Sequence, residues 1–155
     1  MITQRFNSNP AWNIHYNNSF FGLISVTEYV RDKLGVNLNM IEIGAYMGES
    51  TFIFASSRIF YKIHTIEPHL GNDDFNNINN YDWEFVKNEF KTNLRFFNNI
   101  KHYNALSQDT HQHFTDDSFD FIYIDGLHTY EAVKRDIELY LPKLKKGGII
   151  AGHDY

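Results

Sequence analysis

Short apolar runs alternate along the chain with longer segments in which apolar residues recur every three or four positions. Five of the runs are typical of buried strands, namely residues 39–44, 62–67, 100–103, 119–125 and 148–152. The longer segments predict helices over residues 19–35, 49–58, 83–97 and 133–144, the last closed by Pro142, and a weaker helix at 108–114. Residues 1–18 are polar and aperiodic, so we predict an irregular lead-in there.

Strands that alternate with helices along a chain form a parallel sheet with helices on both faces. The sequence therefore predicts an α/β fold with a doubly wound parallel sheet. Its 155 residues suit a single domain over residues 1–155. Ligands in such folds bind beyond the carboxyl ends of the strands, so the residues that follow each strand are the candidates for function.

Composition and charge exclude several classes of protein. The formal net charge of -5, with only 14 lysines and arginines, argues against a nonspecific nucleic-acid binder. The absence of cysteine excludes disulfides and thiolate metal sites, and it agrees with a cytoplasmic location. No apolar run approaches the roughly 20 residues that cross a bilayer, and the N-terminus lacks the apolar core of a signal peptide, so we expect no membrane partner.

A glycine-rich turn follows the first predicted strand, in the segment Glu42-Ile-Gly-Ala-Tyr-Met-Gly-Glu-Ser50. Gly44 and Gly48 allow the backbone to pass close to a ligand, and the next helix begins there with free N–H groups. The spacing departs from the dinucleotide fingerprint, because Tyr46 stands where that fingerprint has its middle glycine. An ordinary glycine-rich turn explains this segment equally well.

An acidic residue, Glu67, follows the second predicted strand, about 20 residues after the glycine turn. A carboxylate at this place can accept hydrogen bonds from both hydroxyls of a ribose. Alone, Glu67 is equally a surface acid beside Pro68. Together with the glycine turn, it favours a ligand that contains a nucleoside.

Acidic residues and histidines follow the last two predicted strands. Asp125 and His128 come after the fourth strand, and His153 and Asp154 follow the fifth. A carboxylate at the end of an apolar strand is unfavourable unless it is bound or bridged. Carboxylate and imidazole ligands at this density suit a divalent cation. The alternatives are a helix cap for Asp125 and a hydrogen-bonded core histidine for His128.

Four segments together resemble a known enzyme family. They are the glycine turn, the pair Ile66-Glu67, the run Tyr123-Ile-Asp-Gly-Leu-His-Thr-Tyr-Glu131 and the ending Gly147-Gly-Ile-Ile-Ala-Gly-His-Asp-Tyr155. From residue 39 onward the chain resembles the class I S-adenosylmethionine-dependent methyltransferases. More narrowly, it resembles the macrocin-type sugar O-methyltransferases and the cephalosporin-hydroxylase-like proteins. The resemblance implies a Rossmann-like sheet with strand order 3-2-1-4-5.

The resemblance also implies which residues bind S-adenosylmethionine. The residues that match cofactor-binding positions of the family are Glu42, Gly44, Gly48, Ser50, Glu67 and Ser107. In the family the glycines face the methionine part of the cofactor, with the start of the next helix beside it. The position of Glu67 holds the ribose hydroxyls, and that of Ser107 lies near the adenine.

A metal and a general base are implied in the same way. Asp125, His153 and Asp154 match residues that hold a divalent metal, usually magnesium, and His128 matches a histidine proposed as general base. Because imidazole is a poorer ligand for magnesium than carboxylate, His153 makes manganese, iron or no metal a better match. The implied activity is metal-assisted methyl transfer to a hydroxyl of a small, sugar-like acceptor, with Asp125 and His128 as catalytic residues.

The pattern departs from the family after the fifth strand, where members continue into strands six and seven. Without these, the fifth strand is a sheet edge with unpaired backbone groups beside Ile149 and Ile150. We expect a homo-oligomer, or residues 1–18, to cover this edge, unless the sequence is a fragment of a longer protein. Two further functions stay open: a truncated methyltransferase fold that serves binding or assembly without catalysis, and a nicotinamide oxidoreductase, which shares Glu67 but not the glycine spacing.

Overall fold

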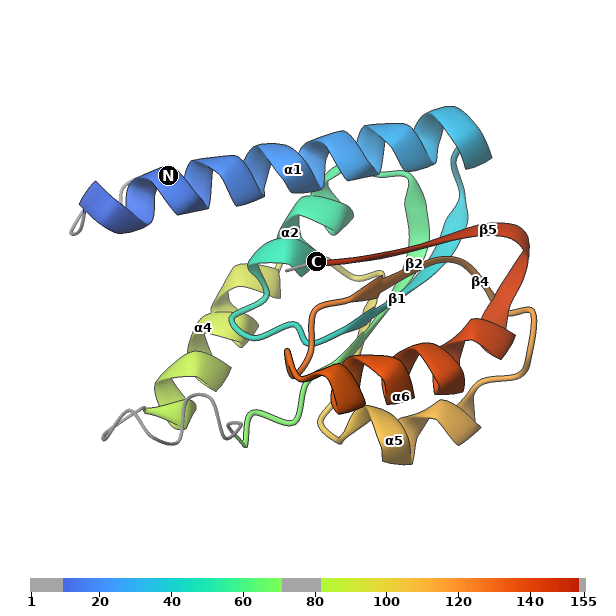
Figure 1. Cartoon of the computed structure of the whole chain (residues 1–155). Helices are drawn as coiled ribbons and strands as arrows, with labels where there is room; N and C mark the ends of the chain where they lie inside the picture. Colours follow the sequence, from blue (N-terminus) through green and yellow to red (C-terminus); the bar gives the residue numbers. More distant parts are fainter. Residues whose placement is uncertain (1–9, 71–81, 154–155) are drawn as a thin grey trace.

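Five parallel strands form the centre of the molecule in the computed structural model, which describes residues 10–70 and 82–153 (Figure 1). The strands are β1 (Leu38–Ile43), β2 (Phe60–Ile66), β3 (Ile100–Tyr103), β4 (Phe119–Ile124) and β5 (Leu144–Gly152). They lie in the order β3-β2-β1-β4-β5, and every neighbouring pair is parallel. The predicted α/β fold and its strand order are confirmed.

The strands end level with one another at their carboxyl ends. Ile43, the last residue of β1, pairs with Ile66 in β2 and with Ile124 in β4. The last residues of β3 and β5 pair with the ends of their neighbours in the same way. The residues that directly follow the strands form one edge, which we call the carboxyl edge: Gly44, Glu67, Asn104, Asp125 and His153.

Helices cover both faces of the sheet. One face carries α1 (Pro10–Leu34) and α2 (Glu49–Ser56), with α4 (Trp83–Leu94) beside α2 (Figure 1). The opposite face carries α5 (Ser107–Thr110), the 3-10 turn η1 (His111–His113), α6 (Tyr130–Tyr140) and the 3-10 turn η2 (Leu141–Lys143). The side chains of Asp82 and Thr129 cap α4 and α6 by accepting hydrogen bonds from the backbone of the first turn.

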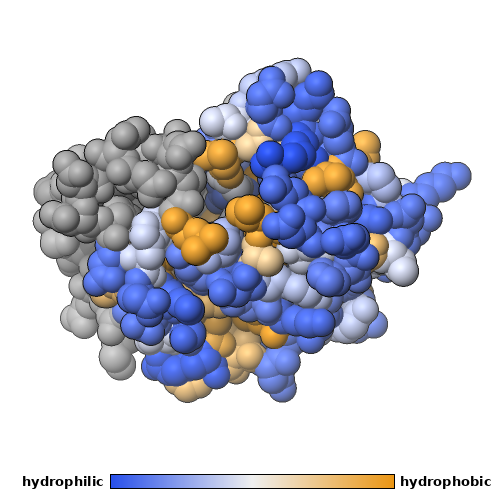
Figure 2. Space-filling model, turned by 90° about the horizontal axis from the view of Figure 1, so that it is seen from below, coloured by the Kyte–Doolittle hydropathy of each residue, from blue (hydrophilic) through white to orange (hydrophobic). Residues whose placement is uncertain are grey.

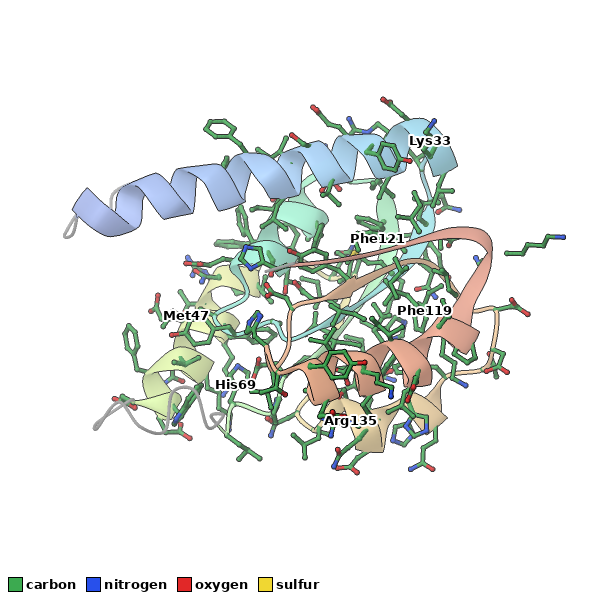
Figure 3. The ribbon with its side chains drawn as sticks, in the orientation of Figure 1. Lys33, Met47, His69, Phe119, Phe121 and Arg135 are labelled. Atoms are coloured by element: carbon green, nitrogen blue, oxygen red, sulfur yellow. The ribbon has the colours of Figure 1, made fainter. Side chains whose placement is uncertain are left out.

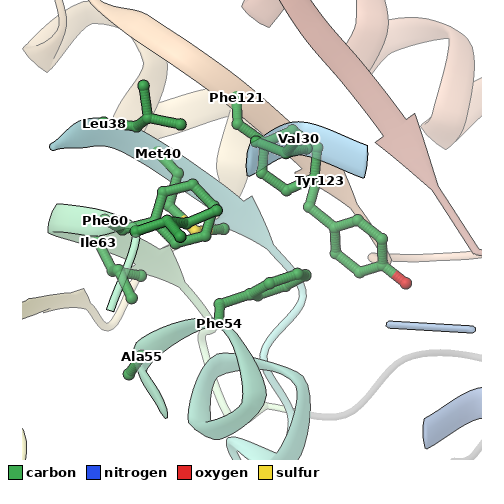
Figure 4. Close-up of a cluster of buried hydrophobic side chains, with 10 residues drawn as sticks. Val30, Leu38, Met40, Phe54, Ala55, Phe60, Ile63, Phe121 and Tyr123 are labelled. Atoms are coloured by element: carbon green, nitrogen blue, oxygen red, sulfur yellow. The ribbon is translucent and has the colours of Figure 1, made fainter. Parts of the chain in front are cut away.

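Buried apolar side chains fill the layers on either side of the sheet. In the layer beneath α1 and α2, the ring of Phe54 meets those of Phe60, Phe121 and Tyr123 at centroid distances of 5.1–6.1 Å (Figure 4). The layer on the opposite face contains the alternate residues of β1 and β4, together with Tyr140 of α6. Successive side chains of a strand point to opposite faces, so the continuous apolar runs of β1 and β4 supply both layers.

The first helix is longer than the apolar pattern predicts. α1 begins at Pro10, so the predicted irregular lead-in is wrong for residues 10–18, while residues 1–9 lie outside the described part of the chain. Proline suits the first turn, because its fixed φ matches a helix and its missing N–H has no partner there. Periodicity reveals only helical turns with an apolar stripe, which the polar sequence over 10–18 does not show.

The last strand also begins earlier than predicted. β5 starts at Leu144, which pairs with Phe119 of β4, and Lys145 Nζ binds the carboxylate of Asp120 at 2.9 Å. Gly147 has a φ of 84° within the strand, a backbone conformation that glycine adopts without strain. Within the described residues β5 pairs only with β4, so its outer side is a sheet edge.

The surface seen from below the view of Figure 1 is mostly hydrophilic, and its apolar residues form separate patches (Figure 2). Over residues 10–70 and 82–153, no helix combines the length and the apolar character that crossing a membrane requires.

Candidate functional site

The carboxyl edge brings together several residues that the sequence predicts for the site. The ladder of backbone hydrogen bonds continues one residue beyond the strands, where each N–H donates to the last carbonyl of a neighbouring strand at 2.7–3.1 Å. This holds for Gly44, Glu67, Asp125 and His153, which are thereby fixed side by side. Asp154, the remaining predicted ligand, lies outside the described residues.

Both glycines of the turn after β1 allow other parts of the chain to approach. A Cβ on Gly44 would lie 2.0 Å from the carbonyl oxygen of Asp125, so the loop after β4 packs directly on the turn. A Cβ on Gly48 would lie 3.0 Å from the side chain of Leu94 in α4. Both have positive φ, at 84° and 79°, which only glycine adopts readily. The turn is therefore closely enclosed by the loop after β4 and by α4.

Glu42 lies beneath this turn and has no exposed surface. Its two carboxyl oxygens bind the hydroxyls of Ser50 and Thr51 in the first turn of α2. Burial raises the pKa of Glu42 from 4.5 to about 8; the two hydroxyl hydrogen bonds oppose the rise, and the charges of Asp125 and Glu67 add to it. This burial argues against the direct cofactor contact predicted for Glu42, which instead supports Ser50 and the start of α2.

Glu67 connects the end of β2 to the glycine turn. Its half-buried carboxylate accepts a hydrogen bond from the Tyr46 N–H at Oε2 (2.9 Å) and one from the His69 N–H at Oε1 (2.8 Å). A carboxylate oxygen can accept more than one hydrogen bond, so both oxygens retain capacity for ligand hydroxyls. The predicted site acid is therefore oriented by the backbone on both sides.

Asp125 lies between two histidines at the ends of β4 and β5. Its Oδ1 is 3.7 Å from Nε2 of His128 and also 3.7 Å from Nδ1 of His153. All three side chains are partly exposed, at 25%, 37% and 39%, so they are open to a ligand. The convergence of these three residues is as the sequence predicts.

The predicted metal site is not found among these residues. Within the described ranges, no group of three or more carboxylate and imidazole side chains is placed so that it could hold a metal ion. At 3.7 Å, Asp125 Oδ1 lies within ion-pair distance of each imidazole when that imidazole is protonated.

Ser107 begins α5 and belongs to a buried network that sequence reasoning missed. Its hydroxyl donates to Oδ1 of Asp136 at 2.6 Å, and its carbonyl accepts a hydrogen bond from the Tyr140 hydroxyl at 2.8 Å. Burial raises the pKa of Asp136, although the Ser107 hydrogen bond opposes this. The network fixes the loop after β3, where the family resemblance implies contact with the adenine. The sequence signal for this network was Asp136, an acidic residue within the apolar stripe of α6.

A hollow of about 620 Å³ adjoins the Asp125 cluster along the outer side of α6. Its lining includes His128 and His153 at one end, followed by Tyr130, Val133 and Ile137. Its walls thus combine two imidazoles with apolar surface.

The chain shares its fold with solved methyltransferase structures. A Staphylococcus aureus protein assigned as a caffeoyl-CoA O-methyltransferase has a TM-score of 0.63 and 22% identity, over 98% of this chain and 69% of that one. The N-methyltransferase NodS from Bradyrhizobium japonicum, in complex with S-adenosylhomocysteine, has a TM-score of 0.58 and 16% identity, over 94% and 63%. A Haemonchus contortus phosphoethanolamine N-methyltransferase, also with S-adenosylhomocysteine, has 15% identity and a TM-score of 0.54, over 74% and 22%. The chain therefore spans less than two thirds of the length of two of these three proteins.

A search of curated proteins finds no match. The narrower likeness to macrocin-type and cephalosporin-hydroxylase-like proteins is not confirmed by these structures and stays a prediction. Residues 41–155, which carry the glycine turn, Glu67 and the Asp125 cluster, match the family model described as a methyltransferase domain. The chain therefore belongs to the methyltransferase-domain family.

Proposed function

We propose that the carboxyl edge binds S-adenosylmethionine and that the chain transfers its methyl group to a hydroxyl oxygen of a small, sugar-like acceptor. The observation that carries the proposal is the placement of Asp125 between His128 and His153, on the same edge as the glycine turn and Glu67. S-adenosylhomocysteine bound in NodS and in the Haemonchus enzyme supports this cofactor.

The residues of the edge fit a positively charged, ribose-containing ligand. S-adenosylmethionine supplies a methyl group on a positively charged sulfur. The charges of Asp125 and Glu67 both raise the pKa of the nearby Glu42, so two carboxylates lie close together at the carboxyl edge and favour a cation there. Glu67 would hold the ribose hydroxyls, the turn from Gly44 to Ser50 would face the methionine part, and Ser107 would lie near the adenine.

We infer that His128 and Asp125 assist the acceptor. In the proposed reaction, an imidazole nitrogen of His128 accepts the proton of the acceptor hydroxyl as the oxygen bonds to the methyl carbon. The bond between that carbon and sulfur breaks, and its electron pair stays on sulfur. The Asp125 carboxylate, 3.7 Å from His128 Nε2, attracts the imidazolium that forms. The fixed edge holds nucleophile and methyl group in line.

Metal assistance is a separate part of the proposal. The described residues do not assemble a metal site, so no step above depends on one. Asp125 and His153, together with Asp154, are the residues that would hold manganese, iron or magnesium. Calorimetric titration with Mg²⁺ and Mn²⁺, in the presence and absence of S-adenosylhomocysteine, tests this part alone.

Mass spectrometry of acceptors incubated with the protein and S-adenosylmethionine tests the function. We expect methylation within a panel of sugars, polyols and catechols, and a loss of about 100-fold or more in His128→Ala and Asp125→Asn. Both variants should still bind S-adenosylhomocysteine. Full activity in both variants would refute the assigned roles. Cofactor binding without any methylation would favour the binding module, and NADH binding would favour an oxidoreductase.

A further inference from the structure

A buried histidine outside the predicted site lies between the glycine turn and Glu67. His69 follows the end of β2, is only 6% exposed and lies at the end of the sheet opposite to Phe119 (Figure 3). Its ring Nε2 is 3.1 Å from the carbonyl oxygen of Tyr46. Because a carbonyl oxygen can only accept, Nε2 carries the proton and donates it.

Three hydrogen bonds close a ring among Tyr46, Glu67 and His69. The Glu67 carboxylate accepts the N–H of Tyr46 on one oxygen and the N–H of His69 on the other, at 2.9 and 2.8 Å. The His69 imidazole completes the ring by donating to Tyr46. The side chains of Glu67 and His69 thus both bond to the backbone of Tyr46, one to its N–H and the other to its carbonyl oxygen.

Two residues of this hydrogen-bonded ring, Tyr46 and His69, have an uncommon backbone conformation. Tyr46 has a φ of 45° and His69 a φ of 50°, although neither is glycine. Such residues persist only where their surroundings determine them, and they cluster at ligand sites. The two strained residues are the two whose N–H groups bind the Glu67 carboxylate, so the strain is tied to the direction in which that carboxylate points.

The imidazole of His69 is fixed by its neighbours. Its ring meets Phe90 of α4 at a centroid distance of 5.2 Å and His102 of β3 at 5.3 Å. His102 in turn bonds to the backbone carbonyl of Glu67 at 2.9 Å. Within the described residues Nδ1 of His69 has no hydrogen-bond partner. The ring bonds to the Tyr46 carbonyl through Nε2, and the Asn104 side chain also approaches it.

Burial of the His69 imidazole favours its neutral form. Burial lowers the pKa of His69, and the positive charges of Lys87 and Lys91 in α4 act in the same direction. The Glu67 charge and the Asn104 side chain, which approaches the ring, oppose them. A neutral ring with its proton on Nε2 can donate to the Tyr46 carbonyl.

We propose that His69 is a positioning residue that holds the methionine-facing turn and the ribose-binding carboxylate in a fixed mutual arrangement. This inference rests on the proposed function, in which the turn and Glu67 bind the two halves of one cofactor. A ligand that spans both halves gains from their fixed alignment, whereas adenosine, which occupies one half, gains little.

Two variants separate the hydrogen bond from the packing of the ring. His69→Phe keeps an aromatic ring against Phe90 but cannot donate, whereas His69→Gln keeps a donor near Nε2 without the ring. His64→Phe is the matched control, because His64 is a half-buried β2 histidine that bonds to Tyr103 rather than to the turn. Calorimetry measures binding of S-adenosylhomocysteine and of adenosine to each, and thermal melting measures stability.

We expect His69→Phe to weaken S-adenosylhomocysteine binding by about tenfold, the size of one lost buried hydrogen bond. Adenosine should weaken by less than about threefold, and His69→Gln should stay within about threefold of wild type for both ligands. His64→Phe should bind both ligands as wild type does. Unchanged S-adenosylhomocysteine binding in His69→Phe would overturn the inference. Equal losses for both ligands that follow the melting temperature would also overturn it, because they indicate packing alone. Failure of wild type to bind S-adenosylhomocysteine would instead refute the proposed function, and the inference with it.

Discussion

Replacing Glu42 with glutamine should change how the stability of the protein depends on pH. Glutamine has nearly the shape of a protonated glutamate, and it can still form hydrogen bonds with Ser50 and Thr51. At or below pH 4.5, where Glu42 is protonated in both the folded and the unfolded chain, Glu42→Gln should therefore unfold within about 1 kcal/mol of wild type. The two proteins should diverge progressively as the pH rises above 4.5.

The direction and size of the divergence follow from the raised pKa. The pKa of Glu42 is 4.5 in the unfolded chain and about 8 in the folded one, so between these values the folded state binds one proton more. Stability from this group is fully present below pH 4.5 and falls as pH rises, by about 1.4 kcal/mol per pH unit. Over the whole interval the loss amounts to about 5 kcal/mol. The glutamine side chain in Glu42→Gln does not titrate, so this variant loses none of that stability.

Urea unfolding of both proteins at pH 5, 6, 7 and 8 measures this difference. Other groups, such as the histidines, titrate equally in both proteins, so they cancel when the two free energies of unfolding are subtracted. We expect the difference to shift in favour of Glu42→Gln by several kcal/mol between pH 5 and pH 8. Glu28→Gln, which removes an exposed carboxyl of α1, is the control and should follow wild type. A difference that stays constant with pH would refute the assigned protonation state.

Three further predictions concern the scaffold. Gly44→Ala should destabilise the protein by about 2–4 kcal/mol in thermal or urea unfolding, because its Cβ would overlap the Asp125 carbonyl. The control Gly22→Ala, in an open position of α1, should be neutral or stabilising. Equal effects of the two substitutions would contradict the geometry. Burial lowers the pKa of His64 from 6.5 to about 4, so its contribution to stability is present above pH 6.5 and falls with pH toward 4. His64→Phe should therefore lose less stability than wild type in acid titrations followed by circular dichroism, and identical acid midpoints would count against this. We propose that a second copy covers the β5 edge, so light scattering should give at least a dimer mass, and a monomer at all concentrations would reject the proposal.

The sheet could be predicted from the sequence because its signals are local. Each strand is a short apolar run, and alternation with helices is sufficient to predict a parallel sheet. The two elements whose starts differ from the prediction, α1 and β5, lack such a local signal there. Residues 10–18 are helical without an apolar stripe, and Lys145 extends β5 through an ion pair with Asp120 that only the folded chain brings together.

The candidate site was predictable where residues directly follow strands, because parallel strands deliver those residues to one edge. This explains why Asp125 and His153 converge as predicted, with His128 three residues further along the loop after β4. Burial was harder to foresee. Glu42 interrupts the apolar run of β1, a sign of a buried carboxyl, but its hydroxyl partners lie in α2. The hydrogen-bonded ring of Tyr46, Glu67 and His69 depends on the backbone of Tyr46, and a pattern of residue types does not reveal a backbone contact. The predicted metal depends on exact placement of ligands, which spacing does not determine.

Calorimetric titration of the folded wild-type chain with S-adenosylhomocysteine tests the central claim most directly. If the carboxyl edge is a cofactor site, binding should saturate at one ligand per chain, and Glu67→Ala should weaken it by at least about tenfold through loss of the ribose hydrogen bonds. Circular dichroism should show that the variant remains folded. Absence of saturable binding to the folded wild-type chain, or equal affinity in folded Glu67→Ala, would contradict the account.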